Sequence, residues 1–138
     1  MIRYAIRKFC DYYFRKIDKL LELEISELLS TKEKEIFNKM DYYDKWHGME
    51  VYKKMKDKTS DELYLKFSLL HDCGKHRASF LLRVLTKLNF KTRLKEHPKI
   101  GYLMLKDINK EVAELILHHH DKNTKGLLKI FQDCDDRS

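Results

Sequence analysis

The sequence predicts an all-α protein, a compact single-domain bundle of about six to seven helices. Its 138 residues contain one proline and four glycines but abundant leucine, isoleucine, lysine and glutamate, a composition that favours helices over a turn-rich sheet protein. Apolar residues recur at helical spacing in successive segments. The length allows one buried core and leaves no room for a second domain.

The first thirty residues are expected to form one long or broken amphipathic helix. Apolar side chains recur at helical spacing from Ala5 through Phe9 and Ile17 to Leu28. We predict that this stripe packs against the core, and a homodimer contact through the same helix is the second interpretation. Residues 1–30 are therefore treated as an N-terminal helical extension, and residues 31–138 as the main compact unit.

The next two helices are predicted from a cap and from a buried stripe. Ser30 and Glu33 form a capping-box pattern, in which the two side chains satisfy free backbone N–H groups at a helix start. Further along, His47, Val51 and Met55 share one face of a helix, so the histidine is expected to face the core.

The following helices are marked by further start and stop signals. Asp61 lies where it can cap a helix that ends at His71, with Gly74 as the stop. Residues 80–88 continue as a helix, and Pro98 at a first-turn position starts another. On that later helix we predict three buried residues, Ile100, Leu103 and Met104.

The side chains that carry chemistry are histidines and aspartates. His71 and Asp72 are adjacent at the end of a predicted core helix, a rigid position for metal ligands. The remaining candidates are His47, His97, the run His118, His119 and His120, and the acidic run Asp133, Asp135 and Asp136. Imidazole nitrogens and carboxylate oxygens are ligands that Zn, Mn, Fe, Co and Ni all accept. The pattern predicts a metal-dependent hydrolase.

Helical geometry ranks the neighbouring candidates. At about 100° per residue, the apolar face defined by Val112 and Ile116 has His119 near its centre, His120 at its border and His118 well off it. His119 is therefore the preferred ligand of the three.

The same construction applies to the last helix, where Leu127, Phe131 and Cys134 form the apolar face. Asp135 lies near this face and Asp133 on the far side. Asp135 is the preferred closing ligand, and Asp133 stays open as an alternative.

The ordered set of His47, His71-Asp72, His97, His119 and Asp135 resembles the HD-domain phosphohydrolase superfamily, from about Glu33 to Asp136. The resemblance implies an HD-type helical bundle for residues 31–138. It also implies one or two divalent ions per chain, which could be Mn, Fe, Ni, Co, Zn or Mg. One ion would be held by His47, His71, Asp72 and Asp135, and the second by His97 and His119, perhaps with His120, Asp72 bridging the two.

Residues 71–121 also look like the HD-GYP subgroup, through their His-Asp-x-Gly-Lys, His-Pro and His-His-acid segments. Two features differ from that subgroup. No Gly-Tyr-Pro follows Gly126, and Tyr43 stands where that subgroup would carry a glutamate ligand.

Phosphoester hydrolysis, with a nucleotide or another phosphorylated small molecule as substrate, is the function that the resemblance implies. Asp72 and Lys75 are the predicted catalytic residues, since a cation beside the metal ligands can neutralise a phosphoryl oxygen. His76 and Arg77 are weaker candidates for the same role. The alternatives are a regulatory module that binds metal and nucleotide without turnover, and a cyclic-dinucleotide phosphodiesterase.

The net charge and the cysteine content indicate which binding partners and which cellular compartment to expect. The formal net charge of +7 suits an anionic ligand, but the lysines are scattered as on an ordinary solvated surface, so nucleic acid is not an expected partner. Three cysteines without a Cys-x-x-Cys pair argue against a disulfide framework and favour the reducing cytoplasm. Of these, Cys73 and Cys134 are expected to fill core space. The sequence shows neither a signal peptide nor a membrane span.

Overall fold

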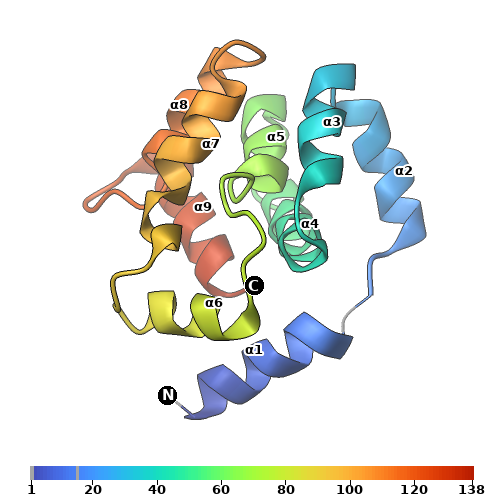
Figure 1. Ribbon diagram of the computed structural model, residues 1–138. Helices are drawn as coiled ribbons and strands as arrows, with labels where there is room; N and C mark the ends of the chain where they lie inside the picture. Colours follow the sequence, from blue (N-terminus) through green and yellow to red (C-terminus); the bar gives the residue numbers. More distant parts are fainter. Residues whose placement is uncertain (1, 15) are drawn as a thin grey trace.

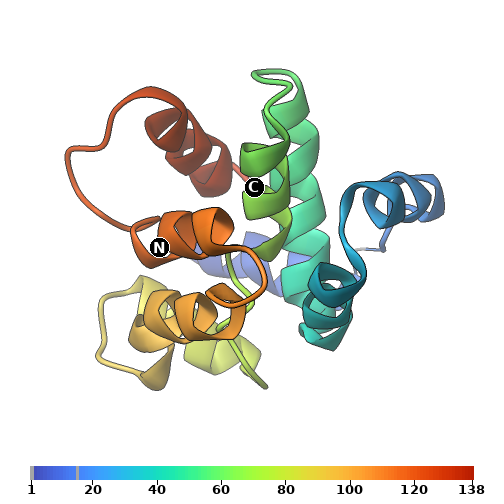
Figure 2. The same ribbon diagram turned by 90° about the horizontal axis from the view of Figure 1, so that it is seen from above.

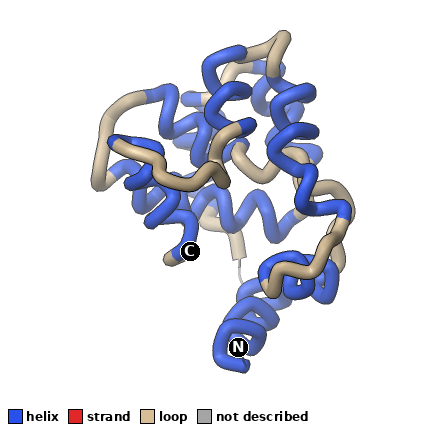
Figure 3. Tube along the Cα trace, turned by 90° about the vertical axis from the view of Figure 1, so that its left-hand side faces the viewer, coloured by secondary structure: helices blue, strands red, loops and turns tan. Residues whose placement is uncertain are grey.

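The computed structural model describes residues 2–14 and 16–138. Throughout this part of the chain there are helices and no strand, so the all-α prediction is confirmed (Figure 3). The α-helices, in chain order, are α1 (Ile2–Phe14), α2 (Lys19–Leu28), α3 (Thr31–Lys39), α4 (Tyr42–Lys56), α5 (Glu62–Leu70), α6 (Phe80–Lys87), α7 (His97–Leu105), α8 (Lys110–Leu117) and α9 (Gly126–Asp136). A 3₁₀ helix, η1 (Arg93–Glu96), leads directly into α7.

The predicted number of six to seven helices is too low, because the described residues form nine α-helices. Many of these helices are short. Several of them begin at a residue whose side chain accepts hydrogen bonds from free backbone N–H groups, namely Asp18 at α2, Asp61 at α5, Ser79 at α6 and Asn109 at α8. Caps of this kind stabilise new helix starts, so the N-terminal extension divides into α1 and α2. The capping box predicted at Ser30 and Glu33 is confirmed at the start of α3.

The bundle is arranged around α4 and α5, which pack against each other in the middle of the molecule (Figure 1). The pair α7 and α8 lies on one side of them, and α2 and α3 lie on the other (Figure 2). Helix α9 packs against both α4 and α5. Helices α6 and α1 contact each other and lie together at one end of the bundle.

The core is centred where α4, α5, α8 and α9 meet. The rings of Phe67 and Phe131 lie 4.1 Å apart between centroids, and both side chains are completely buried. Cys73 and Cys134 belong to the same buried cluster, so their predicted role as core residues is confirmed. Burial raises the pKa of both thiols, which therefore stay protonated and act as small apolar groups.

The two helices of the N-terminal extension differ in what they bury. Helix α2 contributes Leu21 to the core, as predicted, together with Ile25, which the predicted stripe did not include, whereas Leu20 of that stripe is 78% exposed. The same prediction is wrong for α1: no apolar side chain that the structure describes on this helix is buried, and Phe9 is 44% exposed. The reason is tertiary, because α1 packs on α6, which itself lies outside the core.

Gly74 and α7 also differ from expectation, for one shared reason. Helix α5 ends at Leu70, and Gly74 does not adopt the left-handed conformation of a helix stop. A Cβ on Gly74 would lie 2.1 Å from the carbonyl oxygen of His97 and 2.7 Å from the backbone nitrogen of Gly101. The glycine is therefore required because the chain after α5 presses directly against α7.

That contact sets which face of α7 is buried. His97, Gly101 and Leu105, spaced four residues apart, face the core. Ile100 and Leu103, predicted to be buried, are 42% and 55% exposed, and Met104 is only half-buried. Gly101 lies on the buried face of α7 in place of a larger apolar residue, because its small size lets α7 approach the turn at Gly74 closely.

Candidate metal centre

Four side chains from three regions of the bundle form an inner cluster, defined as His47, His71, Asp72 and Asp135. His47 comes from α4, Asp135 from α9, and the adjacent His71 and Asp72 from the turn after α5. The Nε2 atom of His47 lies 2.7 Å from Asp135 Oδ1 and 3.9 Å from Asp72 Oδ2. The Nε2 atom of His71 lies 3.2 Å from Asp135 Oδ1 and 3.3 Å from Asp72 Oδ2.

The inner cluster requires positive charge at its centre. The Nδ1 atom of His71 is 2.8 Å from the Ser68 carbonyl oxygen, to which it must donate, whereas its Nε2 atom is buried without a hydrogen-bond partner among the described residues. Burial opposes a charge on this imidazole, but the carboxylates of Asp72 and Asp135 outweigh that effect and raise the pKa of His71. A divalent cation supplies the same charge, so the donor set fits a metal ion.

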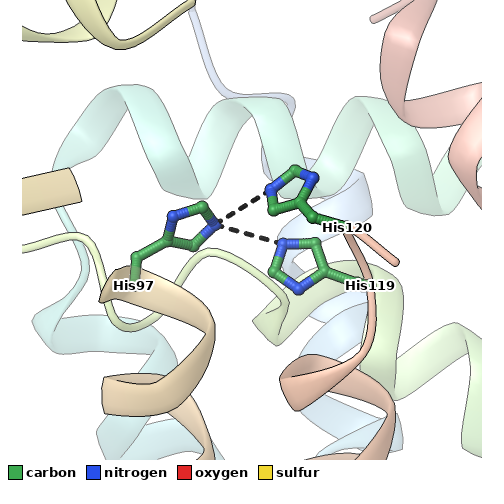
Figure 4. Close-up of side chains that lie close together, drawn as sticks. All are labelled: His97, His119 and His120. Atoms are coloured by element: carbon green, nitrogen blue, oxygen red, sulfur yellow. Dashed lines mark hydrogen bonds between the residues drawn. The ribbon is translucent and has the colours of Figure 1, made fainter. Parts of the chain in front are cut away.

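Three histidines, His97, His119 and His120, form an outer cluster beside the inner one (Figure 4). His97 begins α7, and the other two follow the end of α8. The Nε2 atom of His97 lies 3.1 Å from that of His119 and 3.3 Å from that of His120. In Figure 4 the rings converge on the space between these atoms.

The tautomers of the outer cluster also favour a shared cation. The Nδ1 atoms of His97 and His119 each contact a backbone carbonyl oxygen three residues earlier, those of Leu94 and Ile116. Because a carbonyl oxygen only accepts, both rings donate from Nδ1, so the Nε2 atom of either ring in its neutral form carries a lone pair that points into the space between them. Burial and the neighbouring histidines lower the pKa of His119, which keeps this ring neutral and able to bind metal.

Asp72 joins the two clusters through its two carboxylate oxygens. Oδ2 faces the inner cluster, and Oδ1 lies 3.2 Å from His97 Nε2 and 3.9 Å from His119 Nε2. The ammonium of Lys75 lies 3.2 Å from Oδ2. Burial works against this ammonium, but the carboxylates of Asp72 and Asp44 outweigh it and raise the pKa of Lys75, so the lysine stays charged.

Several sequence candidates lie away from both clusters. His118 is exposed and its Nδ1 atom contacts Asp121 Oδ2 at 2.8 Å. Asp133 is also exposed and pairs with Lys129 at 3.3 Å. His76 and Arg77, considered for phosphate contact, are exposed and do not line the cavity described below. The structure thus brings together His119 and Asp135, the side chains that helical geometry preferred, and their role as metal ligands stays a prediction.

A cavity of about 540 Å³ opens over the clusters and is large enough for a nucleotide-sized ligand. His47, Asp72, Lys75, His97 and Asp135 lie in its wall. The rest of the wall includes charged and aromatic residues that sequence reasoning did not single out, among them Tyr4, Lys8, Tyr12, Arg83, Lys95 and Lys122. The only local signal for these is the four-residue spacing of the first three, which places them on one stripe of α1.

Tyr43, which replaces the glutamate of the HD-GYP pattern, covers the inner cluster. Its ring lies parallel to that of His47, with 4° between the planes and 6.1 Å between the centroids. The guanidinium of Arg83, which also lines the cavity, lies 4.9 Å from the Tyr43 ring centroid. Tyr43 therefore contributes an apolar ring and a phenol here, where a glutamate would contribute a ligand oxygen.

The fold and the two clusters define a helical domain with a buried histidine and aspartate centre. The sequence model of the HD domain family matches residues 34–137, so the chain belongs to the HD domain family. The matched segment contains both clusters and leaves α1 and α2 outside. Comparison with curated proteins and with solved structures gave no match. In the described part of the chain, no helix is long and apolar enough to cross a membrane.

Proposed function

We propose that this protein is a metal-dependent phosphohydrolase that acts on a phosphoester, with nucleotides as the favoured substrate class. The observation that carries the proposal is the position of the Asp72 carboxylate. Its Oδ2 atom faces the inner imidazoles and its Oδ1 atom faces the outer ones, and the Lys75 ammonium contacts Oδ2. Membership of the HD domain family supports the same class of chemistry.

In this proposal the inner cluster would hold one divalent ion, and the outer cluster together with Asp72 would hold a second. The mixed nitrogen and oxygen donors suit Mn, Fe, Co, Ni or Zn, and Mg is a further candidate. Divalent ions bound in this way stabilise negative charge on phosphoryl oxygens and lower the pKa of water. The Nδ1 hydrogen bonds to backbone carbonyls fix the orientation of His71, His97 and His119.

Lys75 and Asp72 are the proposed catalytic residues. Lys75 lines the cavity beside the metal ligands, where its ammonium can neutralise the charge that builds on a phosphoryl oxygen in the transition state. Asp72 contacts the Lys75 ammonium and histidines of both clusters, so it fixes their positions relative to one another. Arg83 is a poor substitute for Lys75, because four of its five N–H groups already bind Ala78, Asp41 and Asp44.

The test is a hydrolysis panel of mononucleotides, cyclic nucleotides and cyclic dinucleotides, each with Mn, Fe, Co, Ni, Zn and Mg. We expect turnover of at least one phosphoester by the wild type and none by Asp72→Asn, with Asp133→Asn as the matched control. Metal-loaded protein that binds nucleotides tightly but hydrolyses none would instead identify the regulatory module. Cleavage of cyclic dinucleotides alone would identify the phosphodiesterase.

The proposed compartment is the reducing cytoplasm. Cys10, Cys73 and Cys134 are all free thiols, as that compartment favours. A homodimer through the N-terminal helix is also proposed, since Ile2 and Ile6 are exposed on α1.

A further inference from the structure

The buried imidazoles of the two clusters differ in how their rings are held. Those of His71, His97 and His119 each place Nδ1 against a backbone carbonyl oxygen three residues earlier, at 2.8 Å for His71 and 2.6 Å for His97. These carbonyl groups lie in the last turns of α5, η1 and α8, where a helix leaves its final carbonyls free. An imidazole fixed through Nδ1 presents Nε2 to a metal in one orientation.

The His47 ring has no such hydrogen bond. It lies inside α4, where the carbonyl groups one turn earlier accept hydrogen bonds from the backbone N–H groups of the helix itself. Its Nδ1 atom is buried and has no hydrogen-bond partner among the described residues. Nε2 faces Asp135 Oδ1 at 2.7 Å, so a metal ion in the inner cluster would take Nε2 and leave the ring proton on this Nδ1 atom. The orientation of this ring is therefore set by packing.

Tyr43 supplies the parallel packing contact. It precedes His47 by four residues on α4, so the two side chains are neighbours on one face of the helix. Their rings are nearly parallel, with 4° between the planes and 6.1 Å between the centroids, a separation within the range of offset aromatic pairs. The ring of His71 meets that of His47 at 59° and 5.4 Å. Rotation of the His47 imidazole out of its plane would bring it against the Tyr43 ring.

The Tyr43 ring is itself held from α1 and α6, which lie together at one end of the bundle (Figure 1). The Lys8 ammonium on α1 donates to its phenol oxygen at 3.1 Å. The Arg83 guanidinium on α6 lies 4.9 Å from its centroid and is fixed in turn by the carboxylates of Asp41 and Asp44. Burial raises the pKa of Tyr43, so the phenol stays neutral. Tyr43 therefore presents a fixed, uncharged surface to His47.

We propose that Tyr43 is a positioning residue of the metal centre, whose ring orients His47 as the backbone carbonyls orient the other three buried histidines. The inference rests on the proposed function, in which His47 is a ligand of the inner ion. It also gives a role to the residue at which the chain departs from the HD-GYP pattern, because α4 then provides a support for a ligand in place of a further ligand. In this role Tyr43 does not touch the ion, and its effect reaches the centre through His47.

The test measures Co²⁺ binding to the apoprotein by calorimetry and by the visible absorption of the bound ion. The first ion is expected in the inner cluster, which has two carboxylates. We expect Tyr43→Leu to weaken its binding about tenfold, the size of loss that follows when the support of a metal ligand is removed. Tyr43→Phe keeps the ring and should stay within about twofold of the wild type. The absorption spectrum depends on the arrangement of the ligands, so it should change in Tyr43→Leu and not in Tyr43→Phe.

A double-mutant cycle with His47 separates positioning from a general effect on the fold. In the His47→Ala background, Tyr43→Leu should change the affinity for the first ion by less than about twofold, because the residue through which it acts is gone. Tyr52→Leu is the matched control, since Tyr52 is a buried tyrosine on α4 that donates to Glu24 and does not line the cavity. It should lower the thermal stability at least as much as Tyr43→Leu and leave Co²⁺ binding unchanged.

The outcomes separate this inference from the proposed function. Wild-type affinity in Tyr43→Leu, an equal loss in Tyr43→Phe, or an equal loss in both His47 backgrounds overturns the role of Tyr43 alone. If His47→Ala binds no Co²⁺, the comparison of Tyr43→Leu with Tyr43→Phe decides. If the wild type binds no divalent ion and hydrolyses no phosphoester, the proposed function fails, and the positioning role of Tyr43 fails with it.

Discussion

The inner and outer clusters are built from the same types of side chain but from different kinds of position. The inner cluster combines two imidazoles with two carboxylates, carried by α4, α9 and the end of α5. The outer cluster has three imidazoles and shares one carboxylate oxygen, and its histidines lie at the start of α7 and after the end of α8. His120 is exposed, whereas His47 and His71 are buried.

This difference teaches how one domain can hold two sites of unequal strength. Two carboxylates would neutralise a divalent ion in the inner cluster, whereas an ion in the outer cluster would depend on the charge that Asp72 shares. His47 also lies within α4, a firmer position for a ligand, whereas the three outer histidines lie at the start of α7 or after the end of α8. We therefore expect the inner ion to bind more tightly.

The largest effect is expected from removing the residues that every version of the site needs. His71→Ala and Asp72→Ala should each lose most of the bound metal and lower activity at least about a thousandfold. The measurement is elemental analysis and turnover on untagged protein. Wild-type protein that cannot be loaded with Mn, Fe, Ni or Zn would contradict both the ligand assignment and the comparison of the clusters.

The double replacement His97→Ala with His119→Ala tests the comparison directly. It should lower the metal content from two ions toward one, because His47, His71, Asp72 and Asp135 keep the first. Titration of metal into the apoprotein by calorimetry, together with anomalous scattering, measures the stoichiometry. Three ions in the wild type, or an unchanged content in the double variant, would show the two-cluster assignment to be wrong.

Lys75→Met is expected to lower kcat about a hundredfold without changing the metal content, since it removes a cation aimed at developing charge and no ligand. Lys75→Arg should recover part of the activity. Lys53→Met, which removes an exposed lysine paired with Glu50, serves as the control. A loss of metal in Lys75→Met as large as in Asp72→Ala would mean that Lys75 acts by holding the centre together.

Gly74→Ala should affect the outer cluster more than the inner one. The added methyl group would press on the backbone of His97 at 2.1 Å, so we expect a loss of about 1–3 kcal/mol in the free energy of unfolding. Weaker binding of the second ion should accompany it, because His97 must move. Urea denaturation and metal titration measure the two effects, and equal weakening of both ions would argue against the proposed separation.

The smallest effects are expected just outside the clusters. Asp133→Asn and His118→Ala replace exposed side chains paired with Lys129 and Asp121, so stability should change by no more than about 0.5 kcal/mol. Metal content and turnover should stay at the wild-type level. Asp135→Asn is the contrasting variant and should lose the inner ion.

Local patterns in the sequence were enough to predict the helices and the side chains that gather at the centre. Ser30 and Asp61 cap helices because capping depends on backbone groups a few residues away. His47, His119 and Asp135 could be predicted to face inward because a helix repeats every 3.6 residues. Helix ends were harder, and His119 lies beyond the end of α8, although it is buried as predicted.

Contacts between remote segments decided the rest. Ile100 is exposed because Gly101 lets α7 approach the turn at Gly74, and no spacing within α7 records that neighbour. Lys8 contacts Tyr43 and Ser138, which are 35 and 130 residues away along the chain, so the four-residue spacing on α1 groups it with Tyr4 and Tyr12 but does not show that this stripe faces the cavity. A helix forms through hydrogen bonds between residues close in the sequence, so its own residues predict it. The packing of helices depends on the shapes and charges of side chains that come into contact only in the folded chain.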